Sequence, residues 1–556
     1  MQFVQKKRIG KSAKWKIKDH IEFDPEVIFA AKDTLRDDPL CRVIKDNNVR
    51  CSMFVTAGNS EKVFLKIYKQ RNWKDAFKYT FFTSKALSEW KALNKFSRIG
   101  LPVPKTLAVY EEKQFGLLKK SCLFIEAIPN SLTLNALNKA FFSSPLAKNK
   151  LVLKKKLIRR LAGLISSIHS KGIFYRDLHG GNILVYLNEK QNLHFSFIDL
   201  HKAKFLPFLP MWFKIYDLAK LLQTFSPKTT DAFYFFTEYA KNSLILPDDI
   251  KKYATKIKRR VSKLQTKHIR SRTKRCMIKS SGFVVIKRKG QRAYLRKEYD
   301  KTLDLILRHI KINTNQKSSI LKESKKSKLF WLSIDNDQMA KKICVKKDLH
   351  PGFFYKIKNI MRNSRAKRSW IASNGLRVRG ISTPESIALI ENTKGLFIKK
   401  SFYIYEYISH AERLNKYILK TFGDKISVTT KRKQKFVCML AQEIRKIHNK
   451  GIYHADLKSD NILVVENGND NWQFYFVDLD RVYFKKRLSL KERVNNLAQI
   501  NASVADCISV SDRIYFFNEY AKKSSFIKQN KKIYRQIIKI GKTKNTHYYG
   551  VDFTVK

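Results

Sequence analysis

The chain has 556 residues, enough for two domains of ordinary size, and 44% of them are hydrophobic, which excludes a disordered chain. It carries 114 Lys and Arg against 46 Asp and Glu, a formal net charge of +68. Acidic partners are therefore expected: a nucleotide, a phosphorylated glycan, an anionic lipid surface or nucleic acid. Seven scattered cysteines without a C-x-x-C pair argue against a disulfide framework and against a zinc site.

The N-terminal residues 1–20 contain no apolar core of a secretory signal. No apolar run reaches the length of about 20 residues that spans a membrane. The simplest expectation is a cytoplasmic protein, with peripheral contact to a membrane surface left open.

A long internal repeat divides the chain. Asp177 and Asp456 stand in matching sequences with an offset of 279 residues (456 − 177 = 279). Such a period indicates tandem domains, because solenoid repeats are only about 20–50 residues long. We place the domains at 1–265 and 266–556. The boundary falls in the basic stretch 256–275, which is either a solvated helix or a linker.

The first repeat begins with strand patterns. Residues 43–56 predict a hairpin, without a G-x-G-x-x-G sequence at its turn. Lys66 lies within the apolar strand 63–67, where a lysine either reaches solvent from a sheet edge or binds phosphate. Glu89 lies on the predicted helix 84–96, either as a partner for the strand lysine or on a solvated face.

The most informative stretch contains Asp177, Asn182 and Asp199, with the two aspartates at an interval of 22 positions (199 − 177 = 22). Short apolar runs at Asn182 and before Asp199 predict two strands that bring these residues side by side. Amide and carboxylate oxygens suit Mg²⁺, and a separate carboxylate can accept a hydroxyl proton during phosphoryl transfer. The pattern resembles the loops of the protein-kinase fold. We therefore predict Asp177 as the catalytic base and Asn182 with Asp199 as metal ligands. Lys66 and Glu89 are then expected at the phosphates of ATP.

The sequence after Asp199 lacks an A-P-E motif and a long activation loop, which disfavours a protein substrate. Asp217 either anchors the backbone of the catalytic loop or simply begins a helix, and the second repeat has Asn496 in its place. The run 205–213 is strongly apolar, and we interpret it as a packed loop rather than a membrane contact.

The second repeat keeps the same set of residues. Asp456 is the predicted base, and Asn461 with Asp478 are the predicted metal ligands at the same interval (478 − 456 = 22). Lys346 stands in the position of the strand lysine, where it would bind nucleotide. The Lys- and Ser-rich stretch 313–328 predicts a loop.

The helix of the second repeat departs from the pattern. Aligning the two helix tryptophans places Ser369 where Glu89 stands, so Lys346 has no acidic partner there. Asp348 or Glu385 would be the alternative partner. We therefore expect the first repeat to be the faster enzyme, because misplacement costs rate in a reaction driven by positioning.

Six motifs together resemble the lipopolysaccharide core kinase family (Kdo/WaaP type). They are A-L-S-E-W (86–90), G-L-P-V-P (100–104), Y-R-D-L-H-G-G-N (175–182), S-R-A-K-R-S-W (364–370), G-I-S-T-P (380–384) and R-V-N-N-L-A (493–498). The resemblance covers about 40–240 and 328–521.

This resemblance implies an α+β fold with two tandem protein-kinase-like domains, each with a small β-rich N-lobe and a mainly helical C-lobe. The expected lobes are about 40–128 and 129–255, then 275–407 and 408–530. It also implies an ATP-dependent enzyme that phosphorylates a sugar of the lipid A–core at the cytoplasmic face of the inner membrane.

Other functions remain open on the same residues. A protein or small-molecule kinase would share the fold, and a scaffold would pair a kinase with a pseudokinase. The expected partners are ATP, an anionic glycolipid or phosphorylated sugar as acceptor, and an anionic membrane surface. Nucleic acid is not expected, because only the charge supports it and no nucleic-acid-binding motif occurs.

Overall fold

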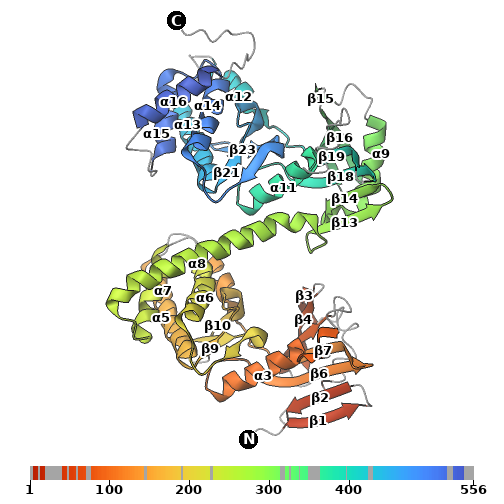
Figure 1. Ribbon diagram of the computed structural model, residues 1–556, viewed down its shortest axis with the longest axis vertical. Coiled ribbons are helices and arrows are strands. Elements are labelled where there is room, and N and C mark those ends of the chain that lie inside the picture. The colour runs from red at the N-terminus through yellow and green to blue at the C-terminus, as the bar shows by residue number, and fades with distance from the viewer. Residues whose placement is uncertain are drawn as a thin grey trace. The chain divides into compact units, whose positions relative to one another are not determined.

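Each half of the chain joins an antiparallel sheet to a group of helices (Figure 1). The computed structural model forms two compact units, residues 1–265 and 266–556. It describes residues 4–9, 13–18, 25, 41–46, 49–57, 61–69, 77–79, 81–142, 147–188, 192–225, 229–313, 320–324, 327–336, 339–348, 363–395, 397–423, 430–522 and 530–543.

The N-lobe of unit 1 is a seven-stranded sheet in the order β1-β2-β6-β7-β5-β4-β3. Its strands are β1 (Val4–Ile9), β2 (Ala13–Lys18), β3 (Cys41–Asp46), β4 (Arg50–Ala57), β5 (Glu61–Tyr68), β6 (Thr106–Gln114) and β7 (Leu117–Glu126). Helix α3 (Lys85–Arg98) packs on β6 and β7, and the Ser84 side chain caps it. Because β2 pairs with β6, the expected start of this lobe near residue 40 is wrong.

The C-lobe of unit 1 is mainly helical. Its helices are α4 (Leu134–Phe141), α5 (Lys148–Ser170), α6 (Met211–Leu222), α7 (Thr229–Asn242) and α8 (Pro247–Lys274). Four short strands lie between α5 and α6: β9 (Ile173–Phe174), β10 (Ile183–Leu187), β11 (Leu193–Phe197) and β12 (Lys204–Phe205). A fifth, β8 (Leu132–Thr133), precedes α4 and pairs with β10. The apolar face of α5 is buried in the core at Leu157, Leu161, Ile165 and Ile168.

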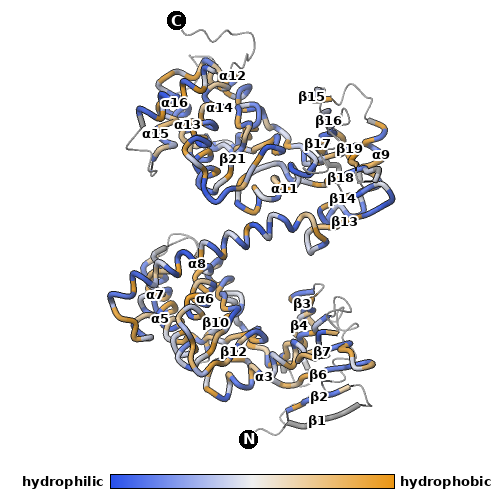
Figure 2. The backbone as a smooth tube through the Cα atoms, viewed as in Figure 1, coloured by the Kyte–Doolittle hydropathy of each residue, from blue (hydrophilic) through white to orange (hydrophobic). Residues whose placement is uncertain are grey.

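Helix α8 runs through the stretch that the sequence left open between a helix and a linker. Hydrophobic residues recur along it between hydrophilic ones (Figure 2). Ile257 is buried in the core of unit 1, with Ile250, Tyr253 and Leu264 packed against that core. The helix alternative is therefore correct.

Unit 2 repeats the seven-stranded sheet in the order β13-β14-β18-β19-β17-β16-β15. Its strands are β13 (Phe283–Arg288), β14 (Gln291–Arg296), β15 (Ile320–Ser324), β16 (Ser327–Asn336), β17 (Met339–Asp348), β18 (Ser386–Lys394) and β19 (Phe397–Glu406). Helix α9 (Leu303–Asn313) packs on β16, and α11 (Arg365–Val378) packs on β17, β18 and β19. Part of the loop predicted at 313–328 is strand β15, because β15 pairs with β16 in a hairpin.

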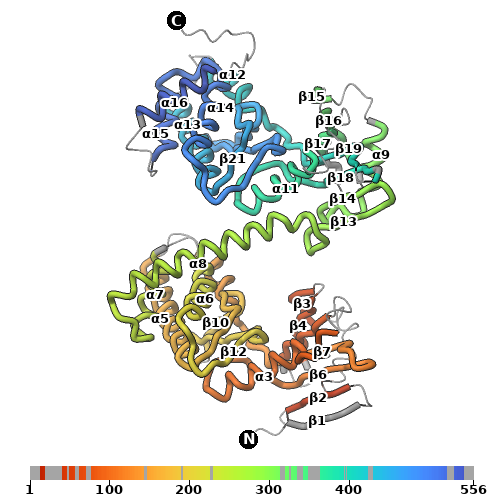
Figure 3. The backbone as a smooth tube through the Cα atoms, viewed as in Figure 1, coloured from red at the N-terminus to blue at the C-terminus, as the bar shows by residue number. Residues whose placement is uncertain are grey.

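The second C-lobe is also mainly helical, and the colours of Figure 3 let the reader trace the chain through it. Its helices are α12 (Leu414–Phe422), α13 (Thr430–Asn449), α14 (Leu490–Ser503), α15 (Val510–Ala521) and α16 (Asn530–Thr543). Its short strands are β20 (Glu412–Arg413), β21 (Ile452–His454), β22 (Ile462–Glu466), β23 (Trp472–Phe476) and β24 (Val482–Phe484). Because α16 buries Ile533 and Ile537 in this core, the expected end of the lobe near 530 is wrong. Among the described residues, no helix is long and apolar enough to cross a membrane.

Candidate active site

Strand β5 and helix α3 bring Lys66 and Glu89 together inside unit 1. Lys66 is 1% exposed and Glu89 0% exposed, with Lys66 Nζ 2.6 Å from Glu89 Oε1. Tyr68, on the same face of β5, donates its hydroxyl to the other oxygen of Glu89. Asp199 Oδ1 lies 2.9 Å from Lys66 Nζ and 2.6 Å from Arg50 Nη1. The surface alternatives for Lys66 and Glu89 are therefore wrong.

Charges in this cluster outweigh the effect of burial. Burial alone would lower the pKa of Lys66, but the charges of Glu89 and Asp199 raise it. Burial would likewise raise the pKa of Asp199, but the charges of Lys66 and Arg50 hold it well below its usual range. Asp199 is thus a carboxylate at neutral pH, compensated by two cations.

Asp217 fixes the backbone of the catalytic loop in unit 1. This residue is 0% exposed and accepts hydrogen bonds from the amides of Tyr175 (2.8 Å) and Arg176 (2.9 Å). The Tyr175 hydroxyl donates to the carbonyl of Ile198 at 2.6 Å, which ties this loop to the residue before Asp199. The anchor interpretation of Asp217 is correct, and the simple helix-start alternative is wrong.

Asn182 and Asp177 are held at the neighbouring end of β10. Asn182 Nδ2 donates to the Asp177 carbonyl at 3.1 Å, and the Asn182 carbonyl accepts a hydrogen bond from the residue before Asp199 at 3.1 Å. The carboxylate of Asp177 accepts hydrogen bonds from Lys202 and Lys220, each at 2.6 Å. Burial would raise the pKa of Asp177, but these two lysines lower it to about 2.

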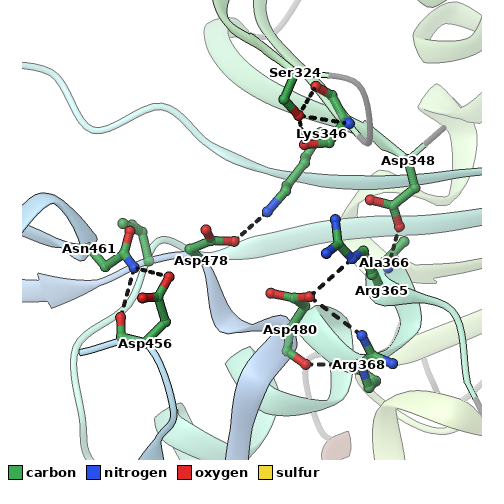
Figure 4. A network of polar contacts seen from close by, with 12 residues as sticks. Ser324, Lys346, Asp348, Arg365, Ala366, Arg368, Asp456, Asn461, Asp478 and Asp480 are labelled. Atoms are coloured by element: carbon green, nitrogen blue, oxygen red, sulfur yellow. Dashed lines mark hydrogen bonds and ion pairs between the residues drawn. The ribbon is translucent and has the colours of Figure 1, made fainter. Parts of the chain in front are cut away.

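Unit 2 assembles a related site, shown in Figure 4. Lys346 donates to Asp478, and Asn461 Nδ2 donates to the carbonyl of Asp456 at 2.8 Å and to its Oδ2 at 3.2 Å. Asp478 adopts the left-handed conformation with φ 58°, as Asp199 does with φ 61°. Side chains other than glycine hold such a conformation only when their surroundings fix it, which is common at functional sites.

Neither alternative carboxylate reaches Lys346. Asp348 is buried and instead accepts a hydrogen bond from the Ala366 amide at the start of α11 at 2.8 Å (Figure 4). It accepts a second one from the Ser401 hydroxyl at 3.1 Å. Burial raises the pKa of Asp348 to about 6. Glu385 pairs with two arginines, at 3.0 and 2.7 Å. Within the described part of the chain, the ion-pair partner of Lys346 is Asp478.

Arginines connect α11 to the loop after Asp478. Arg365 Nε and Arg368 Nη2 each lie 3.4 Å from Asp480 Oδ2, and Arg368 Nε donates to the Asp480 carbonyl at 2.9 Å (Figure 4). In unit 1 the helix instead presents an acid to the strand lysine. The helix therefore contributes an acidic side chain to the site in unit 1 and basic side chains in unit 2.

In unit 2, two side chains of α14 bind carbonyl groups of the loop that precedes Asp456. Asn496 Nδ2 donates to the His454 carbonyl at 2.7 Å, and Gln499 Nε2 donates to the Ala455 carbonyl at 2.9 Å. His448 is buried and lies 3.1 Å from Asn496 Oδ1 through its Nε2. His448 therefore supports the loop by packing and by this contact with Asn496.

A family model described as the lipopolysaccharide kinase (Kdo/WaaP) family matches residues 40–239 and 313–530, more than half of the chain. The chain belongs to this family. It is a kinase of the Kdo/WaaP family with an α+β fold, built from two tandem protein-kinase-like domains. The resemblance drawn from the sequence motifs is confirmed.

Two solved structures are similar to this Kdo/WaaP family member. One is WaaP in complex with acyl carrier protein, at 19% identity and a TM-score of 0.31, covering 40% of this chain and 88% of that one. The other is a Rio2 kinase–ADP/Mg²⁺–phosphoaspartate complex from Chaetomium thermophilum, at 14% identity and a TM-score of 0.25, covering 48% and 82%. No curated protein matches the chain.

The family implies a metal, and the donor atoms of both sites suit magnesium. Each site pairs one amide oxygen with one carboxylate, from Asn182 with Asp199 and from Asn461 with Asp478. Among the described residues, no group of three or more His, Cys, Asp or Glu could hold a metal by itself. Phosphate and water oxygens would complete the coordination, as is usual for magnesium at nucleotide sites.

Sequence reasoning missed several residues of this Kdo/WaaP kinase site. Lys220 follows Asp217 by three residues, one turn along α6, and that spacing could have placed it beside the catalytic loop. Lys202 follows Asp199 by three residues. Arg50 carried no signal, because its contact with Asp199 joins residues 149 positions apart.

Proposed function

We propose that the chain is an ATP-dependent kinase that phosphorylates a sugar hydroxyl of a lipopolysaccharide-type acceptor, with unit 1 as the faster site. The observation that supports this is the convergence at one site of Asp177, Asn182 and Asp199 with the buried pair of Lys66 and Glu89. Phosphoryl transfer depends mainly on such positioning and on compensation of charge.

Each side chain then has a defined part in the reaction. Lys66, held by Glu89, contacts the ATP phosphates. Lys202 and Lys220 offset the negative charge that develops on the reacting groups beside Asp177 during transfer. The acceptor hydroxyl forms the new O–P bond as the γ-phosphoryl leaves ADP, and its proton passes to Asp177. Bound magnesium, held by Asn182 and Asp199, would neutralise charge on the β- and γ-phosphates.

The low pKa of Asp177, about 2, keeps this carboxylate ionised at neutral pH. It is therefore always available to orient the hydroxyl, but it is a weak base. A weak base suffices in a loose transition state, because the acceptor hydroxyl becomes acidic only late in the reaction and then gives its proton to Asp177.

A glycolipid acceptor accounts for two features of the chain. Asp217 follows Asp199 by only 18 positions (217 − 199 = 18), which leaves little chain to hold a peptide. The net charge of +68 favours an anionic acceptor and peripheral association with the cytoplasmic face of an inner membrane. Flotation with anionic vesicles should fall as salt rises, whereas equal flotation with neutral vesicles would contradict membrane attraction through charge.

A second candidate concerns unit 2 alone. The link from Arg368 to Asp480 fixes α11 without supplying an acid to Lys346, which favours a pseudokinase or scaffold role for this unit. In that case unit 2 binds nucleotide or acceptor while unit 1 catalyses transfer.

Radiolabelled ATP tests the proposal with the full chain, because α8 continues through the division at residue 265. Purified chain, labelled ATP and magnesium are mixed with a bacterial glycolipid extract, with a protein substrate mixture or with free aminosugars. Label in the glycolipid supports the proposal, and label only in protein or aminosugar assigns the alternative kinase class. Nucleotide titration of Lys66→Met and Lys346→Met then shows which unit binds ATP.

A further inference from the structure

A cavity of about 760 Å³ opens beside the catalytic loop of unit 1. It lies between the short strands β9 and β12, the first turns of α6 and the middle of α8. Arg176, which directly precedes Asp177, contributes to its wall. The cavity is therefore adjacent in the chain to the predicted base, and none of the residues assigned above to ATP lines it.

The charge of the cavity has one sign. Six cationic side chains line it: Arg176, Lys204, Lys256, Arg259, Arg260 and Lys263. Among the described residues that line the cavity none is acidic, and none of the six cations forms an ion pair with another described residue. Six cations facing one space repel each other, so an anion that enters relieves this repulsion.

Aromatic rings form another part of the wall. Phe213 packs on Phe174 with ring centroids 4.3 Å apart, and Trp212 stacks on Phe213 at 3.5 Å. The run 205–213, interpreted from the sequence as a packed loop, is only partly packed: Leu209 is buried, but Trp212 is 64% exposed and Phe208, just before α6, is 74% exposed. Exposed aromatic rings beside cations offer flat apolar faces for the C–H surface of a sugar ring.

The loop geometry beside the cavity is fixed. Arg176 has φ 67°, and its amide donates to the buried carboxylate of Asp217 at 2.9 Å. A left-handed arginine is strained and is kept only when its surroundings over-determine it. The guanidinium of Arg260 lies over the ring of Tyr216 at 4.9 Å, which holds a second cation in place.

Four residues of the cavity wall are replaced in unit 2, although helices α6 and α14 begin in the same register (490 − 211 = 279). Counterparts at this offset change Arg176 to Ala455, Lys204 to Tyr483, Trp212 to Lys491 and Phe213 to Glu492. Glu492 there caps α14 from its first turn. The arginine, the lysine and the aromatic pair thus occur together in unit 1 and are lost together in unit 2.

We propose that this cavity binds a phosphorylated sugar of the acceptor, with the cations on the phosphate and Trp212 on the sugar ring. The inference rests on the proposed function and adds the place where a phosphate of the acceptor binds, at the wall of this cavity and apart from the ATP site. The donor phosphates meet Lys66 and the acceptor phosphate meets α8, so the two anions do not compete for the same cations.

Binding of glucosamine 6-phosphate to the full chain tests the cavity without any need for turnover. The cavity variant is Lys256→Ala/Lys263→Ala, and the matched control is Lys251→Ala/Lys258→Ala, which removes the same charge from exposed positions of the same helix. We expect the cavity variant to raise the Kd about tenfold or more and the control to change it less than about twofold. Equal weakening in both variants overturns the proposal, because it shows only general attraction by charge.

Trp212→Ala separates the sugar from the phosphate. Its expected effect is weaker binding of glucosamine 6-phosphate and unchanged binding of inorganic phosphate, whereas equal loss of both contradicts the stacking role. Vesicles that contain monophosphorylated lipid A form a second arm, since the same headgroup can arrive free or lipid-linked. Loss of vesicle binding in the cavity variant but not in the control supports the lipid-linked source, and binding to neutral vesicles that is insensitive to both variants contradicts it.

The kinase proposal and the cavity proposal can be contradicted independently of each other. Sugar phosphate binding that depends on the cavity, without any phosphate transfer, supports the cavity and contradicts the kinase proposal. Transfer to glycolipid with unchanged KM for acceptor in the cavity variant contradicts the cavity alone. ATP titration in every variant verifies that the donor site is intact.

Discussion

Lys66 and Glu89 form a buried ion pair between β5 and α3, with Nζ and Oε1 2.6 Å apart. Removing one partner of a buried pair leaves an uncompensated charge. We expect Glu89→Gln to slow transfer about 100-fold at saturating ATP, because Lys66 loses its alignment. It should also lower the free energy of unfolding by about 3 kcal/mol. Transfer rates and thermal unfolding measure both effects, with Glu112→Gln on β6 as a control that changes neither. Wild-type transfer by Glu89→Gln would contradict the positioning role.

Substituting each of the two predicted bases in turn shows which unit catalyses phosphate transfer. In the full chain, Asp177→Asn should reduce phosphate transfer at saturating ATP by about 100-fold or more, the range expected for loss of a general base. Asp456→Asn should leave most of the activity, because Lys346 lacks a helix acid. Both variants should retain ATP binding, since Lys66 and Lys346 are unchanged. If Asp456→Asn abolishes transfer while Asp177→Asn does not, the assignment is reversed and unit 2 is the enzyme.

The link between Arg368 and Asp480 should stabilise unit 2 without serving catalysis in unit 1. We expect Asp480→Asn to lower the free energy of unfolding of unit 2 by about 1–3 kcal/mol, because Asp480 is nearly buried. The double variant Asp480→Asn/Arg368→Ala should be less destabilised than the sum of the single variants. Thermal unfolding provides the values, and Asp506→Asn serves as an exposed control in the same unit. Additive losses would show that the two side chains are not coupled.

Asp348 should give unit 2 a pH-dependent stability. Its pKa is raised from 3.8 to about 6 by burial, so the folded state holds a proton that the unfolded chain releases earlier. Stability from this group is complete below about pH 4 and is lost as the pH rises through 6. The difference in free energy of unfolding between the wild type and Asp348→Asn should therefore change by about 2–3 kcal/mol from pH 4 to 7. Parallel stability curves would contradict this, and Asp177, with a pKa of about 2, does not titrate in the same range.

Local patterns predicted the parts of the fold and site that lie close together in sequence. The five-residue step from Asp177 to Asn182 and the alternation in β10 and β11 suffice to place the two predicted metal ligands, Asn182 and Asp199, at neighbouring strand ends. Pairings between distant segments could not be predicted from local sequence patterns. Strand β2 joins β6 across almost a hundred residues, and Arg368 meets Asp480 across 112. The periodicity of hydrophobic residues shows which face of a helix or strand is buried, but it does not show which other segment packs against that face.

The opposite charges on α3 and α11 restrict which parts of the two units can be exchanged by engineering. His201 stands where unit 2 has Asp480 (480 − 201 = 279), so each helix matches its own loop. Grafting α3 into unit 2 would set Glu89 near a second carboxylate, and grafting α11 into unit 1 would leave Lys66 without its acid. A working chimera has to transplant the helix and the loop together, and natural substitutions at these positions should co-vary as sets.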